Sequence, residues 1–195
     1  HVRGGLVATC TGDHGGVVHY KRSRQGHAEI DRTVAHVLAR TGTPHRLLDF
    51  CPVGSDERQY CSPGFDLPIG SLMRTYYFDW PAYHTSDDDL SAVSARSLGE
   101  MIVLYLRAFE VMDVNRCWKR TDGRCEPQLS KRGLYPSLGS QRDTRLAVDR
   151  TMWALNLADG AHDTITMAER AGCAAWEMAA VVEPLVRAGL LTAAG

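Results

Sequence analysis

Short apolar runs alternate with a helical repeat over the first part of the chain. The runs are bounded by glycine, proline and polar residues, which favours strands at 4–10, 15–22, 45–50 and 69–77. Between the second and third runs, residues 27–40 form a helical repeat whose apolar positions share one face: Ile30, Val34, Val37 and Leu38. Strands that alternate with helices indicate an α/β domain with a largely parallel sheet.

The longest amphipathic pattern predicts a helix from about residue 86 to residue 114. Ser86 or Asp87 can cap its N-terminus. Asp88 and Asp89 would then lie in the first turn, where the helix dipole favours negative charge. The pattern therefore predicts one long helix at the end of the α/β domain.

The composition changes after Asn115. The following segment is polar, rich in glycine and proline, and weakly periodic, which predicts a linker with at most a short hairpin. The rest of the chain has helical periodicity throughout, with three short helices and a tight turn between the second and third. Such a group suggests a helix-turn-helix or winged-helix-like module. The predicted organisation has three parts: an α/β domain at 1–116, a linker at 117–140 and a helical module at 141–195.

Composition limits the function classes. The 195 residues are 44% apolar, so a sizeable core can be buried. The 22 Lys and Arg are balanced by 23 Asp and Glu, which argues against a basic face for nucleic acid or a membrane surface. The sequence contains no run of 18 apolar residues, so we expect no membrane-spanning helix. The six Cys form no CxxC pair, so we expect reduced thiols in a cytoplasmic protein rather than a structural zinc knuckle.

Candidate chemistry gathers in three loops that follow predicted strands. These loops are 12–16, 54–60 and 81–88, and each carries Asp or His. Ligands of open α/β sheets bind outside the carboxyl ends of the strands. Polar groups that converge there define a candidate site.

His84 is open to three interpretations: a metal ligand, a general base, or a residue that only packs. Trp80 and Tyr83 can pack beside its ring. Asp87 or Asp88 could accept a hydrogen bond from the ring nitrogen that a metal leaves unused, as is typical of His ligands.

The other two loops also have two interpretations each. The run Ser-Asp-Glu-Arg is either a solvated turn or a functional loop, in which Asp56 and Glu57 orient other groups or bind metal and Arg58 holds a substrate carboxylate. Asp13 lies in GDHGG, where a tight turn also requires such residues. Ser55 is not in a GxSxG elbow, and no phosphate-binding glycine loop occurs.

Several long segments resemble one protein family. The central ones are VGSDERQYCSPGFDLPIGSLMRT and, shortly after it, YHTSDDDL. TCTGDHGG, YKRSRQGHAEIDR and EPQLSKRGLYPSLG extend the likeness over almost the whole chain. Together they resemble a bacterial family of aminopeptidase-like zinc proteins with a C-terminal winged helix. The resemblance implies a three-layer α/β sheet domain that is incomplete at its N-terminus.

The resemblance also implies roles for individual residues. His84 matches the His of the closing HT…D motif and would be a zinc ligand, with Asp88 as its neighbour. Asp13 falls near the acidic zinc ligand. Asp56 would lie beside the ligands rather than bind metal itself. The family's first His, its bridging Asp and its general-base Glu come from a segment before residue 1, so the catalytic residues of this chain are not identified.

The implied activity is zinc-dependent hydrolysis of an amide or peptide bond, on a peptide or a small modified metabolite. Arg58, Arg74 and Tyr83 are candidates for substrate contacts. The alternative is a non-catalytic scaffold whose acidic tail contacts a protein. Residues 141–195 hold five Arg and no Lys against seven acidic residues, a net charge of −2, so DNA is an unfavourable partner. We expect protein contact or homo-oligomer formation through this module.

Overall fold

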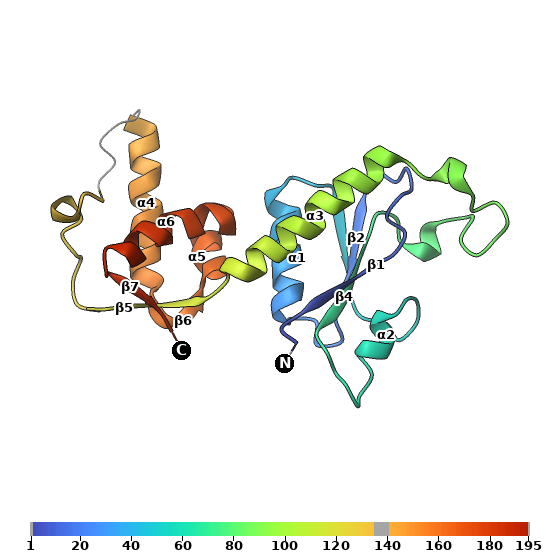
Figure 1. Ribbon diagram of the computed structural model, residues 1–195, viewed down its shortest axis with the longest axis horizontal. Coiled ribbons are helices and arrows are strands. Elements are labelled where there is room, and N and C mark those ends of the chain that lie inside the picture. Colours follow the sequence, from blue (N-terminus) through green and yellow to red (C-terminus); the bar gives the residue numbers. More distant parts are fainter. Residues whose placement is uncertain (1, 135–140, 195) are drawn as a thin grey trace. The chain divides into compact units, whose positions relative to one another are not determined.

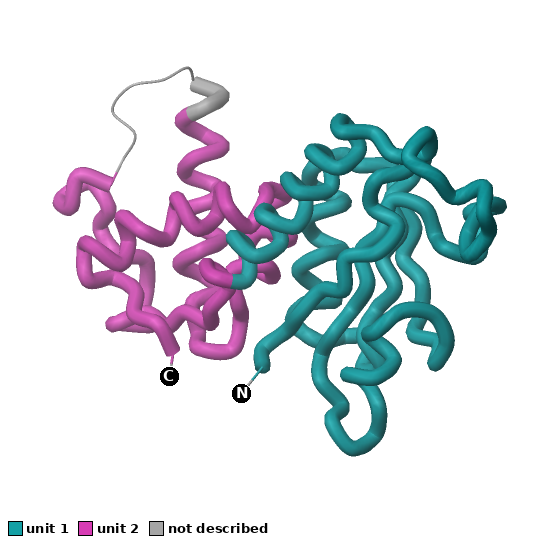
Figure 2. Tube along the Cα trace, turned by 45° about the vertical axis from the view of Figure 1, so that its right-hand side comes forward, with its two compact units in different colours: residues 1–112 teal, residues 113–195 magenta. Residues whose placement is uncertain are grey.

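The computed structural model describes residues 2–134 and 141–194. The chain divides into two compact units, His1–Met112 and Asp113–Gly195 (Figures 1 and 2). The first unit contains β1 (Gly5–Ala8), β2 (Val18–Lys21), α1 (Glu29–Arg40), β3 (His45–Leu48), α2 (Glu57–Tyr60), β4 (Ile69–Met73) and most of α3 (Ala95–Val114). The second contains β5 (Cys117–Arg120), α4 (Gln141–Leu157), β6 (Asp159–Asp163), α5 (Thr164–Arg170), α6 (Ala175–Arg187) and β7 (Leu191–Ala193).

The four strands of the first unit form one mixed sheet in the order β1-β4-β2-β3. β1 pairs with β4 and β2 with β3 in parallel, whereas β2 and β4 are antiparallel. The four expected strands are therefore present, and two of the three pairings are parallel. The loops that leave β1, β3 and β4 carry the candidate residues.

A buried carboxylate fixes the entry into α1. Asp31 accepts hydrogen bonds from the Tyr20 hydroxyl at 2.8 Å, from the Ser23 backbone N–H at 2.7 Å and hydroxyl at 2.6 Å, and from the Ala28 N–H at 2.9 Å. A buried carboxylate with several donors is stabilised in its charged form. This network joins the end of β2 to the first turn of the helix.

The helix expected from residue 86 begins later. Residues 90–92 form a 3-10 turn, and the Asp89 carboxylate accepts from the Ser91 N–H at 2.8 Å. α3 starts at Ala95, where the Ser94 hydroxyl accepts from the Ser97 N–H at 3.3 Å. Short polar side chains compete for local backbone donors in this way and delay a helix. Asp88 and Asp89 are consequently not in the first turn of α3.

The second unit is not purely helical. β5 lies at the centre of a three-stranded antiparallel sheet, with β6 and β7 on either side. β5 lies within 117–140, the segment predicted as a linker, and the division between the two compact units falls after Met112, close to the predicted boundary at residue 116. α4, α5 and α6 lie close to the three expected helices. The hydrogen bonds of the three strands come from partners far apart in sequence, a signal that periodicity does not contain.

Candidate functional site

A small pocket lies where the loop after β1 approaches the segment before α3. Its volume is about 280 Å³, and Asp13, Trp80, Asp88 and the apolar Val93 and Leu98 contribute to its lining. The indole N–H of Trp80 donates to the Asp88 carboxylate at 3.3 Å. The fold therefore brings together two of the predicted loops, 12–16 and 81–88, as the carboxyl-end argument expects.

Asp13 is the most unusual residue of this pocket. Its side chain is buried, and one carboxylate oxygen, Oδ1, accepts from the Gly15 N–H at 2.8 Å and from the Thr75 hydroxyl. The other oxygen, Oδ2, is buried and has no hydrogen-bond partner within the described residues. A buried acceptor without a partner costs about 1–3 kcal/mol, and more when it is charged. Oδ2 is therefore an acceptor ready for a cation or a hydrogen-bond donor.

His84 is exposed and lies four residues before Asp88. Its ring stacks on that of Tyr83, with centroids 4.1 Å apart and an interplanar angle of 18°. Its backbone has φ of 61°, in the left-handed region that residues other than glycine rarely adopt. Cys10 lines the same pocket as Asp13, and its backbone is also in the left-handed region, with φ of 46°. Strained backbone of this kind gathers at functional sites.

Glu57 is buried, although its polar sequence neighbours predicted a solvated turn or a functional loop. Its side chain is fully buried and pairs with the equally buried ammonium of Lys21 at 2.5 Å. The Ser71 hydroxyl donates to Glu57 at 2.6 Å. The position of Glu57 thus indicates a structural anchor between β2, α2 and β4. Its neighbours are both exposed: Asp56 at the N-cap of this short helix and Arg58 in its first turn.

Lys21 was not singled out by the sequence, yet it organises the loop after β3. Its ammonium donates to the Val53 carbonyl at 2.6 Å and to the Tyr77 hydroxyl at 3.1 Å. Burial raises the pKa of Tyr77 to about 12, so that its hydroxyl stays protonated and donates to the Val53 carbonyl at 3.0 Å. The sequence feature that could have identified Lys21 is its place in a short strand with apolar neighbours, because a lysine buried there needs a partner.

Arg74 follows β4 and is largely occupied by protein partners. It donates to the Gly15 carbonyl at 2.8 Å and pairs with Glu100 of α3 at 2.6 Å. These contacts tie the Asp13 loop to α3. The arrangement supports a role in positioning the pocket loop.

The fit to zinc is partial. The unpaired oxygen of Asp13 suits a cation, but no three His, Cys, Asp or Glu side chains among the described residues are arranged to hold a metal ion. A catalytic zinc takes three protein ligands and a water. The described residues alone therefore do not complete a catalytic zinc site.

Comparisons with known proteins define the family. Residues 1–115 match the family described as a domain of unknown function, DUF4910, and residues 116–193 match a winged helix-turn-helix. The chain belongs to the DUF4910 family, and its second unit is a winged helix-turn-helix. This confirms the winged-helix prediction. No helix in the described part of the chain is long and apolar enough to cross a membrane.

Two similar proteins carry more specific names. A Clostridium acetobutylicum protein called "Putative polysaccharide biosynthesis protein with aminopeptidase-like domain" is 40% identical over 192 residues, which cover 98% of this chain and 44% of that protein. A crystal structure of a "putative peptidase" from Clostridium acetobutylicum matches with a TM-score of 0.84 and 36% identity, covering 98% of this chain and 42% of that one. The chain thus spans less than half the length of both. The predicted likeness to aminopeptidase-like proteins is confirmed at this level.

Proposed function

We propose that this chain is part of a cytoplasmic, zinc-dependent aminopeptidase-like hydrolase that cleaves an amide or peptide bond. Its first unit would be part of a three-layer sheet domain. The names of the two similar proteins support the class of reaction, and the polysaccharide name of one supports a small modified metabolite as substrate. Metal-assisted hydrolysis is the chemistry that this class uses.

The observation that carries the proposal is the buried Oδ2 of Asp13. Gly15 and Thr75 hold the other oxygen, so the carboxylate is fixed in orientation before any ligand binds. A preorganised oxygen without a partner is a typical metal donor, and a zinc there would polarise a substrate carbonyl. In this proposal Asp13 and His84 are two ligands, and further donors come from outside the described residues.

The remaining candidates take secondary roles in this proposal. Asp88 and Trp80 shape the wall opposite Asp13. Tyr83 holds the His84 ring by stacking. Arg58 is exposed, and in this proposal it holds a carboxylate of the substrate.

Zinc binding tests the proposal directly. Zinc titrated into a longer polypeptide that includes this chain and the further donors, and measured by calorimetry, should bind near one equivalent, and Asp13→Asn and His84→Ala should each weaken binding by about tenfold or more. Asp49→Asn is the control, because the Asp49 side chain is exposed and lies outside the three candidate loops. Hydrolysis of an aminoacyl anilide by the same zinc-loaded longer polypeptide is the second readout. Zinc binding that Asp13→Asn leaves unchanged would remove Asp13 from the site.

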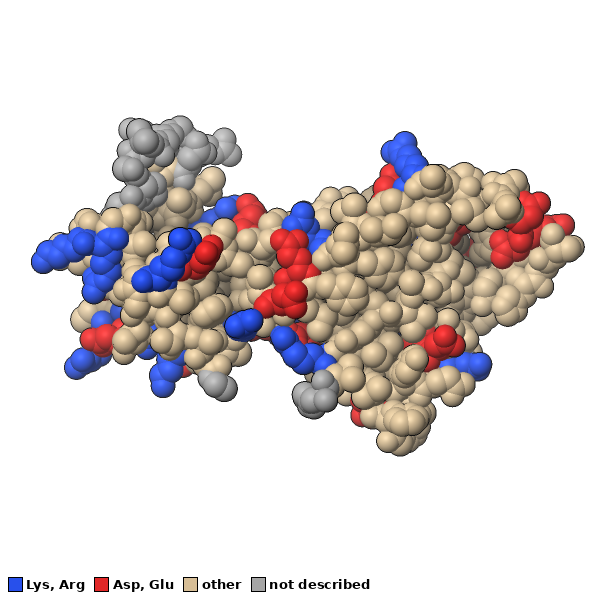
Figure 3. Space-filling view, in the orientation of Figure 1, with Lys and Arg blue, Asp and Glu red and all other residues tan. Residues whose placement is uncertain are grey.

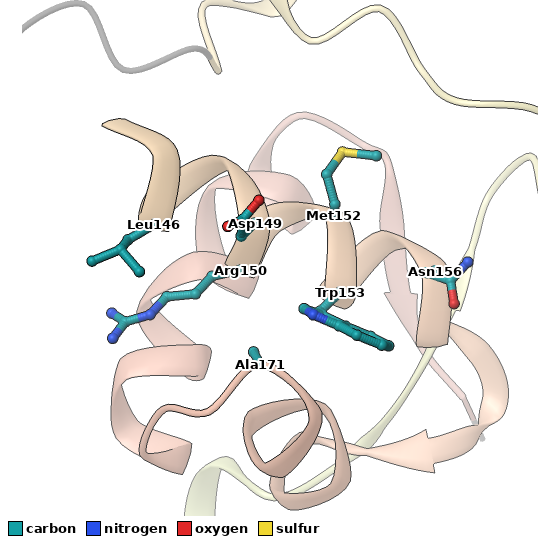
Figure 4. Close-up of a pocket in the computed structure, with 7 residues that line it drawn as sticks. All are labelled: Leu146, Asp149, Arg150, Met152, Trp153, Asn156 and Ala171. Atoms are coloured by element: carbon teal, nitrogen blue, oxygen red, sulfur yellow. The ribbon is translucent and has the colours of Figure 1, made fainter. Parts of the chain in front are cut away.

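A second candidate function is a non-catalytic scaffold that forms a homo-oligomer through its C-terminal unit. One observation favours it: a pocket of about 450 Å³ beside α4, with Leu146 and Trp153 both partly exposed at its wall (Figure 4). Ala171, from the turn between α5 and α6, completes it. Analytical ultracentrifugation of the native chain and of Trp153→Ala tests this alternative. The alternative requires that the native chain form an oligomer and that the variant not form it.

A further inference from the structure

α3 is apolar on two sides, although a surface helix is normally polar on the side that faces water. Its buried side includes Met101, Leu104 and Ala108. A second apolar set is exposed to solvent, and we call it the α3 flank: Leu98 (37% exposed), Ile102 (57%), Leu106 (63%) and Phe109 (45%). Spacings of four and three residues align these side chains along one stripe of the helix.

The α3 flank borders β1. Just before β1, Gly4 lies close to Met112 of α3. A Cβ atom added to Gly4 would be 3.0 Å from the Met112 methyl group. After the end of β1, a Cβ added at Gly12 would be 3.4 Å from Leu98. The Arg3 guanidinium also donates to the Met112 carbonyl at 3.2 Å. α3 therefore passes near both ends of β1 and runs in the opposite direction to it.

β1 is an edge strand. Within the described residues it pairs only with β4, so its other edge presents backbone donors and acceptors. It is four residues long, and proteins normally cover, charge or interrupt such an edge. The sequence of β1, Gly-Leu-Val-Ala, contains no charge or proline that would discourage pairing.

The two flanks of α3 differ in chemistry. On the flank away from Leu98, Glu100 pairs with Arg74 at 2.6 Å and Arg107 pairs with Glu110 at 2.6 Å. On the flank toward β1, Tyr105 reaches across the sheet and its hydroxyl donates to the Leu72 carbonyl of β4. Apolar exposure is thus concentrated on the side of the open strand edge.

We propose that the open edge of β1 and the α3 flank form one interface, which binds a β-strand with an apolar layer behind it. The occupant is the polypeptide that the longer proteins of this kind carry outside the matched region. More than half of each similar protein lies outside the match, so such material is available there. Strand addition would pair the backbone of β1, and the added layer would bury the α3 flank. The interface does not depend on the reaction proposed above.

Co-expression tests this interface. The chain, carrying an affinity tag, is produced together with the part of the Clostridium acetobutylicum protein that lies outside the 192 matched residues. We expect the two polypeptides to co-purify in a 1:1 complex. Ile102→Asp combined with Phe109→Asp should abolish the complex or weaken it by about tenfold or more, since charges at a buried apolar interface are not solvated. Amide exchange in residues 5–8 should slow in the complex.

Val103→Asp is the matched control, because Val103 is 59% exposed and lies on the other flank. It should leave the complex intact, and circular dichroism confirms that each variant is folded. A complex that survives the double substitution overturns the proposal, and so does a folded native chain that forms no complex. If the native chain instead forms a dimer and the double variant is a monomer, the surface binds a second copy of this chain, and the proposed occupant is wrong. Zinc binding is measured separately, so failure of the hydrolase proposal would not affect this result.

Discussion

Lys21 and Glu57 illustrate how one buried pair can decide the structure of a loop. Both side chains are fully buried, and the ammonium also meets backbone carbonyls of the loop after β3. A buried ion pair stabilises only when its remaining hydrogen bonds are satisfied. The partners of Lys21 meet this condition, and they fix the course of the loop that leads to Asp56.

Replacing Lys21 by Met should lower the free energy of unfolding by about 3–5 kcal/mol, because Glu57 would remain buried without its counter-charge. Urea denaturation followed by circular dichroism measures this loss. The double variant Lys21→Met/Glu57→Leu should be more stable than Lys21→Met, since it leaves no uncompensated charge. A single variant as stable as the native chain would show that Glu57 is neutralised or solvated.

Asp159 provides a pH-dependent test. Its carboxylate accepts from the Ala161 N–H at 2.8 Å and contacts the His162 ring at 2.9 Å, and these hydrogen bonds lower its pKa from 3.8 to about 2. The pKa is lower in the folded state than in the unfolded state. The stabilisation is therefore present above about pH 4 and is lost as the pH falls toward 2. Carboxyl chemical shifts in an NMR titration should give a midpoint of about 2 for Asp159, and a midpoint near 3.8 would contradict the turn geometry.

At the scale of elements, two side chains, Asp163 and Asn115, cap the start of α5. Asp163 accepts from the Thr166 N–H at 2.9 Å and its hydroxyl at 2.6 Å. Asn115 donates to the same carboxylate at 3.2 Å and accepts from the Ile165 N–H at 3.1 Å. The start of α5 is thereby linked to the segment that precedes β5, which lies nearly fifty residues earlier in the sequence.

Asp163→Ala should destabilise the second unit by about 1–2 kcal/mol, because the Thr166 N–H in the first turn of α5 loses its acceptor. Thermal denaturation measures the change. Arg170→Ala, at the exposed end of the same helix, is the control and should alter stability by less than about 0.5 kcal/mol. Equal effects of the two substitutions would argue against the cap.

At the scale of the whole molecule, the presence of a winged helix-turn-helix raises the question of whether the second unit binds DNA. Residues 113–195 hold 11 Lys and Arg against 10 Asp and Glu, so adding the segment before α4 changes the balance from −2 to +1. Basic side chains occur on this unit with acidic ones among them (Figure 3). α6, the second helix of the helix-turn-helix, carries two Glu and one Arg. Few phosphate contacts are expected from such a surface.

We predict that the chain binds random-sequence duplex DNA no more tightly than about 10 µM at 0.15 M salt, a strength typical of weak non-specific binding. Fluorescence anisotropy with a labelled duplex measures this affinity. Its salt dependence should be shallow, because few counterions are released. Tighter binding with a steep salt dependence would overturn the prediction and favour a DNA-binding role for the second unit.

Much of the fold was predictable from local patterns. α1 and the three helices of the second unit follow from apolar positions that recur at helical spacing. The four strands of the first unit follow from short apolar runs between turn residues. The loops that carry Asp13 and Asp88 were also expected to converge, because their positions after strands indicate one edge of a sheet.

Tertiary structure decided what depends on partners distant in sequence. β6 has the sequence Asp-Gly-Ala-His-Asp, which has little strand propensity and forms through pairing with β5. The burial of Glu57 depends on Lys21, and the unpaired oxygen of Asp13 depends on Thr75 using the other oxygen. Periodicity acts within a few residues of the chain, so the sequence alone determined most of the helices and the apolar strands of the first unit. Hydrogen bonding and burial act across the folded molecule, so only the tertiary structure determined which candidate side chains are anchors and which remain available to a ligand.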